Sequence, residues 1–539
     1  MPRLRADRSN SDPVVDSDTI TPFTPPRRIF FTRLISSRKI VTLVFTATVG
    51  LLCLSFSRET SLHSASRKRV RSERNSLRVA LRAKVRRGTA LTTTKNSTLL
   101  EICDTHFGQK WLQSWDAAGV DLCSPTGGRG DDVQSTLRCR IMTDSHMTKA
   151  SAPHVLCDAR NLLVDPSFSR GAACPKYRPG YMCQGSSYHQ YSEGAFGGAC
   201  DWPARSLEMF PKDHLRDIMD SFAIYPSGGL PEVAAEDEVA TLFVTREVAE
   251  TGNVFHVLTD LLNAYITLRM LGWEDVKRQV VILDDHADQV LDGFWAAAVA
   301  GGGDQSLESP WNATAAGGRR RLVRRLAEVA SPTRFGRAAF VPPGYSSLLF
   351  AHLFEDNSCP LPTSLFSGFR DFLLRSLDLP APRAVRGNAP LQVTFISRRS
   401  TPQKRTVRMI DNEAEVVAML RAVPGVDVHE VDLAALSLRQ QLEVITSTDI
   451  LIGMHGAAMA WTLVMPSHAA AVELWPSADG IWRCYEHTSQ WAGLLYRRWA
   501  NTDPSKVSTR ERSDYTQVDV AALRVIVEPV VTEMKTRRP

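Results

Sequence analysis

The stretch Asp449–Pro476, DILIGMHGAAMAWTLVMPSHAAAVELWP, decides which fold class this chain can adopt. It opens with consecutive apolar residues from Ile450 to Ile452, a pattern typical of a strand buried on both faces of a parallel sheet. Small residues, among them Gly456 and Ala457, follow that strand. Ligands of open α/β sheets bind beyond the carboxyl ends of the strands, where small residues let backbone N–H groups approach an anionic group. The stretch therefore predicts a phosphate-binding turn at the end of a central strand.

Two polar side chains in this stretch suit the recognition of a nucleotide. His455 lies in the predicted turn and can contact a phosphate or a sugar, while Glu473, at the end of the next strand, can accept hydrogen bonds from ribose hydroxyls. The glycine-rich fingerprints of dinucleotide-binding and Walker-type loops do not occur here. An ordinary strand–turn–helix corner, with small residues that serve only packing, is the alternative.

Strand-like and helix-like patterns alternate on both sides of a linker that contains proline and glycine, residues 380–390. Before the linker, helical apolar spacing over residues 253–272 ends at Gly272, a natural C-cap, and lies between two strand-like runs. After the linker, two strand–helix pairs precede the opening stretch. Because such alternation implies a parallel sheet wound with helices, we predict an α/β fold with two Rossmann-like halves that face each other across a cleft.

The positive charge of the chain is concentrated in its N-terminal tail. Residues 1–95 hold 20 Lys and Arg against 6 Asp and Glu, whereas the rest of the chain holds 44 and 52. The globular part is therefore mildly acidic, which argues against a protein that binds nucleic acid.

One apolar run in this tail, Ile40–Phe56, has 17 residues and no charge, and basic residues precede it. We predict an uncleaved signal anchor that spans a membrane with the N-terminus in the cytoplasm. A cleaved signal peptide or a transit peptide is the alternative. Because a short span suits the thin membranes of the early secretory pathway, we expect a single-pass type II protein of the Golgi membrane, with the endoplasmic reticulum as the second choice.

Cysteine usage predicts a lumenal body that contains disulfides. Of the 10 cysteines, seven lie between residues 103 and 200 without C-x-x-C pairs, which favours disulfides over zinc. Since Cys53 lies in the apolar run, nine cysteines remain, and at least one must be free or bound to another chain. Asn96 and Asn312 each begin a glycosylation sequon.

Segments between about residue 241 and the C-terminus occur together in one known family. In chain order they are NVFHVLTD, VVILDDH, PPGYSSLLF, ISRRSTPQKRTVRMIDNEAEV, ILIGMHGAAMA and AAVELWP. They resemble family 61 glycosyltransferases, most closely the plant-type N-glycan β-1,2-xylosyltransferase group. The resemblance implies a GT-B-like fold, inversion at the anomeric carbon and no need for a metal ion or other cofactor. The implied organisation is a cytoplasmic tail (1–39), a transmembrane anchor (40–56), a basic stem (57–98), an acceptor-side Rossmann-like domain with a cysteine-rich start (99–380) and a nucleotide-sugar-binding Rossmann-like domain (381–539).

The resemblance also implies roles for residues of the C-terminal half. Arg398 follows the strand-like run LQVTFIS, matches the family's arginine and would neutralise the diphosphate as the leaving group departs. The turn His455-Gly456-Ala457 would hold the phosphates, and Glu473 the ribose. An alanine follows this turn where the family has a second glycine, so a binding protein without activity remains an alternative.

The base of an inverting transfer is expected in the N-terminal half. His256 and Asp260 lie four residues apart on the predicted helix and therefore share a face. One base must take the proton of the acceptor hydroxyl, and Asp260 would raise the basicity of His256. A core histidine satisfied by Asp260 is the alternative. Asp284, Asp285 and His286 follow the next strand-like run as other candidates for the base, but they form no clear Asp-x-Asp pattern, so we predict no metal site.

The sequence thus predicts an inverting glycosyltransferase that moves xylose from UDP-xylose to the core of N-linked glycans. A UDP-GlcNAc-dependent protein O-linked N-acetylglucosaminyltransferase is the alternative within the family, and a non-catalytic protein that binds sugar nucleotides is the alternative outside the enzymes. Expected partners are a UDP-sugar, an N-glycan or glycoprotein acceptor, and a membrane through a single N-terminal span.

Overall fold

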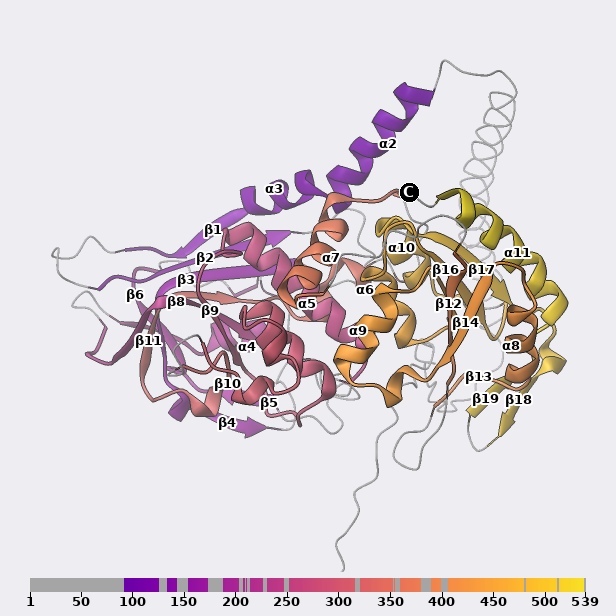
Figure 1. Ribbon diagram of the computed structural model, residues 1–539. Coiled ribbons are helices and arrows are strands. Elements are labelled where there is room, and N and C mark those ends of the chain that lie inside the picture. The colour runs from indigo at the N-terminus through magenta and orange to yellow at the C-terminus, as the bar shows by residue number, and fades with distance from the viewer. Residues whose placement is uncertain are drawn as a thin grey trace, which may run out of the picture. The chain divides into compact units, whose positions relative to one another are not determined.

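The computed structural model describes residues 92–537 with internal gaps (Figure 1). The gaps are 126–132, 143–153, 173–187, 203–206, 209, 211–213, 226–229, 247–251, 316–319, 352, 354–358, 380–388, 399–405, 479–480 and 511–512. The predicted cytoplasmic tail, the anchor 40–56, nearly all of the stem and most of the predicted linker lie outside the described residues. In the part that is described, no helix is both long enough and apolar enough to span a membrane. The fold belongs to one compact unit, Leu100–Pro539.

The larger sheet is mixed rather than parallel. Within the described ranges it has nine strands. Strands β8, β9, β10 and β11 run parallel, whereas β1, β2 and β3 pair antiparallel with one another and β3 pairs antiparallel with β11. The strands lie in the order β1 (Gly119–Cys123), β2 (Thr136–Met142), β3 (His154–Val164), β11 (Thr333–Phe340), β8 (Ala234–Val244), β9 (Arg278–Ile282) and β10 (Val323–Arg325), with β6 (Phe196–Ala199) beside β3 and β7 (Phe222–Tyr225) beside β6.

This sheet differs from the parallel, helix-wound sheet that the sequence predicts for the N-terminal half. The cysteine-rich start contributes strands β1 to β3, and the described chain has no helix between them. Parallel neighbours need a long crossover, usually a helix, so strands that follow one another without one pair antiparallel.

Helix α5 (Val254–Leu271) is the central helix of the N-terminal half and confirms the predicted boundaries. Asn253 is its N-cap, where the side chain accepts a hydrogen bond from the backbone N–H of Phe255. Gly272 ends it in the left-handed conformation, with φ 64° and ψ 34°. All residues from Val254 to Leu268 are buried, because α5 packs against several neighbours, among them α3, α6 and α7. A helix that is apolar around most of its circumference is expected to be buried in this way.

The smaller sheet is entirely parallel, as predicted. Its strands β12 (Leu391–Ile396), β14 (Val426–Val431), β15 (Ile450–Met454), β16 (Ala470–Trp475) and β17 (Leu495–Ala500) lie in the order β14-β12-β15-β16-β17. Helices α8 (Glu413–Arg421), α9 (Leu438–Thr446), α10 (Cys484–Trp491) and α11 (Val520–Arg537) complete this region. The strand order reverses between β12 and β15, and this switch point is where doubly wound sheets bind their ligands.

Further helices and strands lie outside these two sheets. They are α2 (Thr92–Phe107), α3 (Gln109–Ala117), α4 (His214–Asp220), α6 (Leu348–Ala351), α7 (Ser364–Ser376), the ribbon β4 (Ser169–Ala172) with β5 (Tyr188–Tyr191), and the small sheet β13 (Met409–Ile410), β19 (Ser513–Thr516) and β18 (Val507–Arg510).

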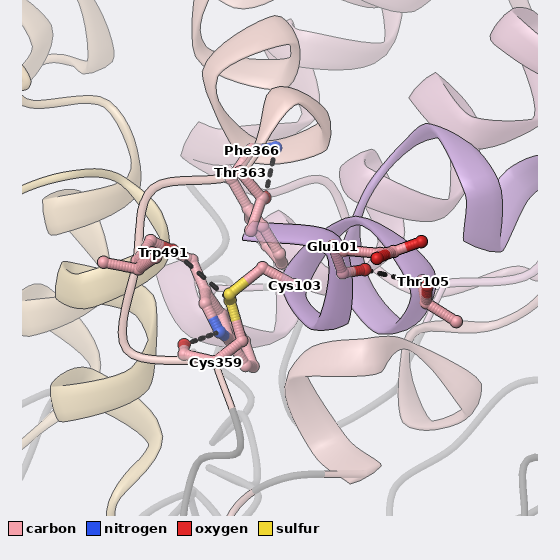
Figure 2. Close-up of a disulfide and its surroundings, with 8 residues drawn as sticks. Glu101, Cys103, Thr105, Cys359, Thr363, Phe366 and Trp491 are labelled. Carbon is pink, nitrogen blue, oxygen red and sulfur yellow. Dashed lines mark hydrogen bonds between the residues drawn. A yellow bond between two sulfur atoms is a disulfide. The ribbon is translucent and has the colours of Figure 1, made fainter. Parts of the chain in front are cut away.

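The predicted disulfides are confirmed among the described residues. Three bonds join Cys103 to Cys359, Cys123 to Cys200 and Cys139 to Cys157. Figure 2 shows that the first of these bonds lies beside Trp491, whose indole N–H donates to the carbonyl oxygen of Cys359 at 3.1 Å. The disulfide therefore ties α2 to the segment before α7, and the hydrogen bond of Trp491 ties that segment to the end of α10. Cys484 is buried and free, and Cys174 and Cys183 lie outside the described residues.

Candidate functional site

The switch point brings together two residues that the sequence assigned to the phosphates. Ile396 of β12 lies opposite Gly453 of β15, so the chain leaves these neighbouring strands at the same edge. Arg398 and Gly456 follow directly. A Cβ atom built on Gly456 would lie only 2.0 Å from Nη1 of Arg398, so the guanidinium rests against the Cα of this glycine. A glycine at 456 therefore leaves room for the guanidinium of Arg398, which a larger residue would displace.

His455 and Glu473 form a buried pair beside this contact. Nδ1 of His455 lies 2.5 Å from Oε1 of Glu473, and the two side chains are 3% and 0% exposed. Tyr496 donates its hydroxyl to Oε2 of the same carboxylate, and Nε of Arg498 lies 3.7 Å from that oxygen. Arg498 in turn donates to Glu486 at 2.6 Å. Protein groups thus contact both oxygens of Glu473, which favours a role in orienting His455; the predicted contact to a ribose stays a prediction.

Burial keeps His455 neutral at physiological pH. Loss of solvation lowers its pKa below the ordinary 6.5, opposed by the hydrogen bond and charge of Glu473 and assisted by the charges of Arg408 and Arg398. A neutral imidazole that donates from Nδ1 to a carboxylate has its other ring nitrogen as an acceptor. Burial, followed by the charge of Glu473, raises the pKa of Tyr496, so this hydroxyl stays protonated and donates.

Aromatic rings enclose the imidazole of His455. The ring centroids of Trp475, Tyr485 and Trp482 lie 3.8, 5.0 and 5.8 Å from its own. Tyr485 also contacts Phe255 at the start of α5, with 5.9 Å between ring centroids. One buried tyrosine therefore connects the predicted donor turn to the helix that carries the predicted base.

A 3-10 helix, η10 (Ala457–Leu463), follows the turn and is almost entirely buried. It packs along α5 and against α10. Ala457 is its first residue, next to the Arg398–Gly456 contact. Met459, Ala460 and Trp461 pack in the hydrophobic core.

His256 and Asp260, the predicted catalytic pair on α5, are both buried, and Asp260 also has a structural partner. Asp260 is 4% exposed, and its Oδ1 accepts a hydrogen bond from the backbone N–H of Gly344 at 2.6 Å. It thereby anchors the turn that follows β11. His256 is 5% exposed, and its ring packs against Phe350 with 5.1 Å between centroids. Their roles in catalysis stay predictions, but Asp260 has a second task that the sequence did not reveal.

Two carboxylates among the other candidates for the base, Asp284 and Asp285, contact basic side chains. Asp284 is fully buried; burial opposes its charge, but Arg246 holds its pKa below the usual value. Nη2 of Arg246 binds Asp284 at 2.7 Å and Nη1 binds Asp292 at 2.8 Å. The carboxylate of Asp285 is partly exposed and lies 3.2 Å from Nε2 of His189. Among the described residues, no group of three or more His, Cys, Asp or Glu side chains is arranged to hold a metal ion.

His286 differs from these carboxylates because its backbone, rather than its ring, binds Arg246. Its carbonyl oxygen accepts from Nη2 of that arginine at 2.9 Å. Burial lowers the pKa of the His286 ring.

Sequence reasoning missed Arg408, Tyr485, Tyr496 and Arg498. The signal for Arg498 exists only once the strands are paired, because Arg498 on β17 lies opposite Glu473 on β16. Tyr496, two residues earlier, projects to the same face of β17. Arg408 donates from Nε to the carbonyl oxygen of His455 at 3.1 Å. No local sequence pattern announces a contact across 47 residues of chain.

Residues 254–472 match the family model Glycosyltransferase 61. An EGF domain-specific O-linked N-acetylglucosamine transferase of Drosophila melanogaster is 33% identical over 141 residues, which is 26% of this chain and 25% of that protein. The protein of the same name from Rattus norvegicus is 32% identical over 155 residues, 28% of this chain and 27% of its own. The Beta-1,2-xylosyltransferase RCN11 of Oryza sativa subsp. japonica is 23% identical over 400 residues, 66% of this chain and 67% of that protein. The chain thus matches the N-acetylglucosamine transferases over only about a quarter of their length.

Proposed function

Because residues 254–472 form a glycosyltransferase family 61 domain, we propose that this chain is an inverting glycosyltransferase that takes its sugar from a UDP-sugar. The proposed arrangement is GT-B-like, with the donor on the half built around the smaller sheet. The observation that carries the proposal is the contact between Arg398 and Gly456 at the switch point of this sheet, next to the buried pair of His455 and Glu473. A guanidinium at this place suits the diphosphate of a nucleotide sugar.

In the proposed reaction, an acceptor hydroxyl attacks the anomeric carbon on the face opposite the diphosphate. The new bond joins the acceptor oxygen to that carbon while the bond from the carbon to the phosphate oxygen breaks. The hydroxyl proton goes to His256, and UDP leaves with the bonding electrons, its charge neutralised by Arg398. Asp260 supports His256 from the same helix while it holds the Gly344 turn. No metal ion is needed in this scheme.

Xylose transferred to the core of N-linked glycans is the first choice of substrate. It is supported by the match to the rice β-1,2-xylosyltransferase, which extends over 66% of this chain. Transfer of N-acetylglucosamine to proteins is the second candidate, supported by the higher identity, 33%, over a shorter stretch. We further propose that the apolar run 40–56 anchors the chain in the Golgi membrane as a single-pass type II protein, with the endoplasmic reticulum second; the disulfides are consistent with such a compartment.

A scan of UDP-sugars with the purified chain tests the proposal. The expected result is transfer from UDP-xylose to an N-glycan acceptor, undiminished by a chelator. In parallel, Arg398→Ala should lose about 2–4 kcal/mol of transition-state stabilisation and nearly all activity. Transfer from UDP-GlcNAc to a protein acceptor would select the second candidate. Tight UDP binding without hydrolysis or transfer of any sugar would identify a non-catalytic binding protein, and activity that returns only with manganese would contradict the metal-free scheme.

A further inference from the structure

Arg408 has a backbone conformation that is unusual for its residue type. Its φ angle is 57°, in the left-handed region. Among the described residues, the other non-glycine residues with positive φ are Asn161 and Asp378. Asn and Asp tolerate this region because their short polar side chains bond to the local backbone, whereas arginine has no such compensation. A residue held in a disfavoured conformation by its surroundings is a frequent feature of binding sites.

The chain after Arg408 is fixed by backbone pairing, which explains how the conformation is imposed. Met409 and Ile410 form β13 and pair with β19. Asn412 then donates from Nδ2 to the carbonyl oxygen of Val518 at 2.9 Å and accepts from its N–H at 2.8 Å. These contacts fix the backbone at the start of β13, and the preceding residue, Arg408, is held in its left-handed conformation by this attachment.

The side chain of Arg408 is anchored at one end only. Its Nε donates to the carbonyl oxygen of His455 at 3.1 Å. Two other buried or partly buried arginines bind carboxylates, Arg246 with Asp284 and Arg498 with Glu486. In the residues that the structure describes, the terminal nitrogens of Arg408 have no hydrogen-bond or ion-pair partner.

Two guanidinium groups therefore meet consecutive residues of one turn. Arg398 rests on the Cα of Gly456, and Arg408 holds the carbonyl oxygen of His455. We propose that Arg408 is a second arginine of the donor site, which binds the diphosphate of the nucleotide together with Arg398. The inference rests on the proposed function and deepens it. A diphosphate carries several negative oxygens, and the planar fork of a guanidinium can bind two of them at once.

A purely structural role, in which Arg408 only holds the turn, makes different predictions. Loss of a phosphate ligand weakens UDP binding and spares the binding of uridine, which has no phosphate. Loss of a residue that only holds the turn displaces the whole turn, so UDP and uridine both bind less well and the melting temperature falls.

The experiment measures UDP affinity by calorimetry and uridine affinity by ligand-observed NMR on the purified full-length chain. Arg408→Ala should weaken UDP binding by about 10- to 100-fold, the value of one charge-assisted contact, and leave uridine binding unchanged. Arg408→Lys, which keeps the charge but loses the fork, should fall in between. Arg524→Ala is the matched control: Arg524 lies exposed on α11 and pairs with Glu528, so UDP binding should stay as in the wild type.

Arg408→Gly separates a loss of UDP binding from a loss of folding stability. Glycine adopts a positive φ without steric cost, so its melting temperature should stay within about 2 °C of the wild type while UDP binding falls as in Arg408→Ala. Equal UDP affinity in Arg408→Ala and the wild type would overturn the inference alone. A joint loss of UDP binding, uridine binding and melting temperature in Arg408→Gly would also overturn it. A wild-type chain that does not bind UDP would overturn the proposed donor site and this inference together.

Discussion

Replacement of Glu473 by glutamine separates two roles for this carboxylate. The side chain is 0% exposed and binds Nδ1 of His455 and the hydroxyl of Tyr496, both of which are donors. A glutamine amide must turn its N–H₂ group toward one of them, so one charge-assisted bond is lost and Arg498 loses a nearby charge. A buried bond to a charged group contributes about 1.5–3 kcal/mol. Because the attraction between Arg498 and the carboxylate is lost as well, we expect Glu473→Gln to lower the free energy of unfolding by about 2–4 kcal/mol.

Glu486→Gln is the matched control, because Glu486 binds the same arginine from a more exposed position, with its side chain 23% exposed. Its expected cost is less than about 1 kcal/mol. The assay is urea-induced unfolding of the full chain followed by tryptophan fluorescence, with UDP affinity measured on the same samples. Equal unfolding midpoints for the two variants would refute the reasoning. Weaker UDP binding by Glu473→Gln with an unchanged midpoint would instead assign Glu473 to the ribose.

Other changes test neighbouring parts of the site. Gly456→Ala should reduce UDP affinity by about tenfold or more without unfolding the protein, because the new methyl group would lie 2.0 Å from the flexible end of Arg398 and displace it; unchanged calorimetric affinity would show that the guanidinium is not needed there. Burial lowers the pKa of His455 from 6.5, so the folded state resists protonation of this ring while the unfolded chain accepts it. The stability that depends on a neutral His455 is therefore present above about pH 6.5 and is lost as the pH falls through the lowered pKa. Melting temperatures of the wild type should fall with acidification more steeply than those of His455→Gln, and parallel curves would argue against this role of His455. His256→Ala should cut turnover by about 10²–10⁴-fold with UDP affinity retained, whereas Asp260→Ala should also lower the melting temperature because it releases the Gly344 N–H; a loss of stability in both variants with equal loss of UDP binding would make the pair structural.

The sequence predicted correctly those helices and strands whose boundaries are set by neighbouring residues. The helix over 253–272 could be predicted because Asn253 caps its start and Gly272 ends it, and both signals lie in the sequence itself. The strand before His455 could be predicted from its unbroken apolar run, and the turn from its small residues. The smaller sheet followed because its strands alternate with helices, which dictates parallel pairing.

Features that depend on distant pairing were out of reach. The antiparallel strands β1 to β3 depend on pairing within the cysteine-rich start, and the partner of Cys103 lies 256 residues away. The environment of Glu473 depends on the register of β16 with β17, which places Arg498 opposite it. The position of Arg408 depends on the pairing of β13 with β19. Each of these results from contacts between segments that the sequence presents far apart.

The bond between Cys103 and Cys359 has a consequence for proteolysis of this chain. Every element from α3 to α6 lies between these two cysteines in the sequence. A single cut in that span therefore separates no fragment: the nicked protein should migrate at full mass without reductant and as two pieces with it. In the unfolded chain, the same bond closes a loop whose ends are 256 residues apart, which removes entropy worth roughly 5.5 kcal/mol in the chain-entropy treatment. A thiol reagent removes this covalent link, after which α2 is held at Trp491 by packing, in which Phe107 contacts the indole with 4.7 Å between ring centroids.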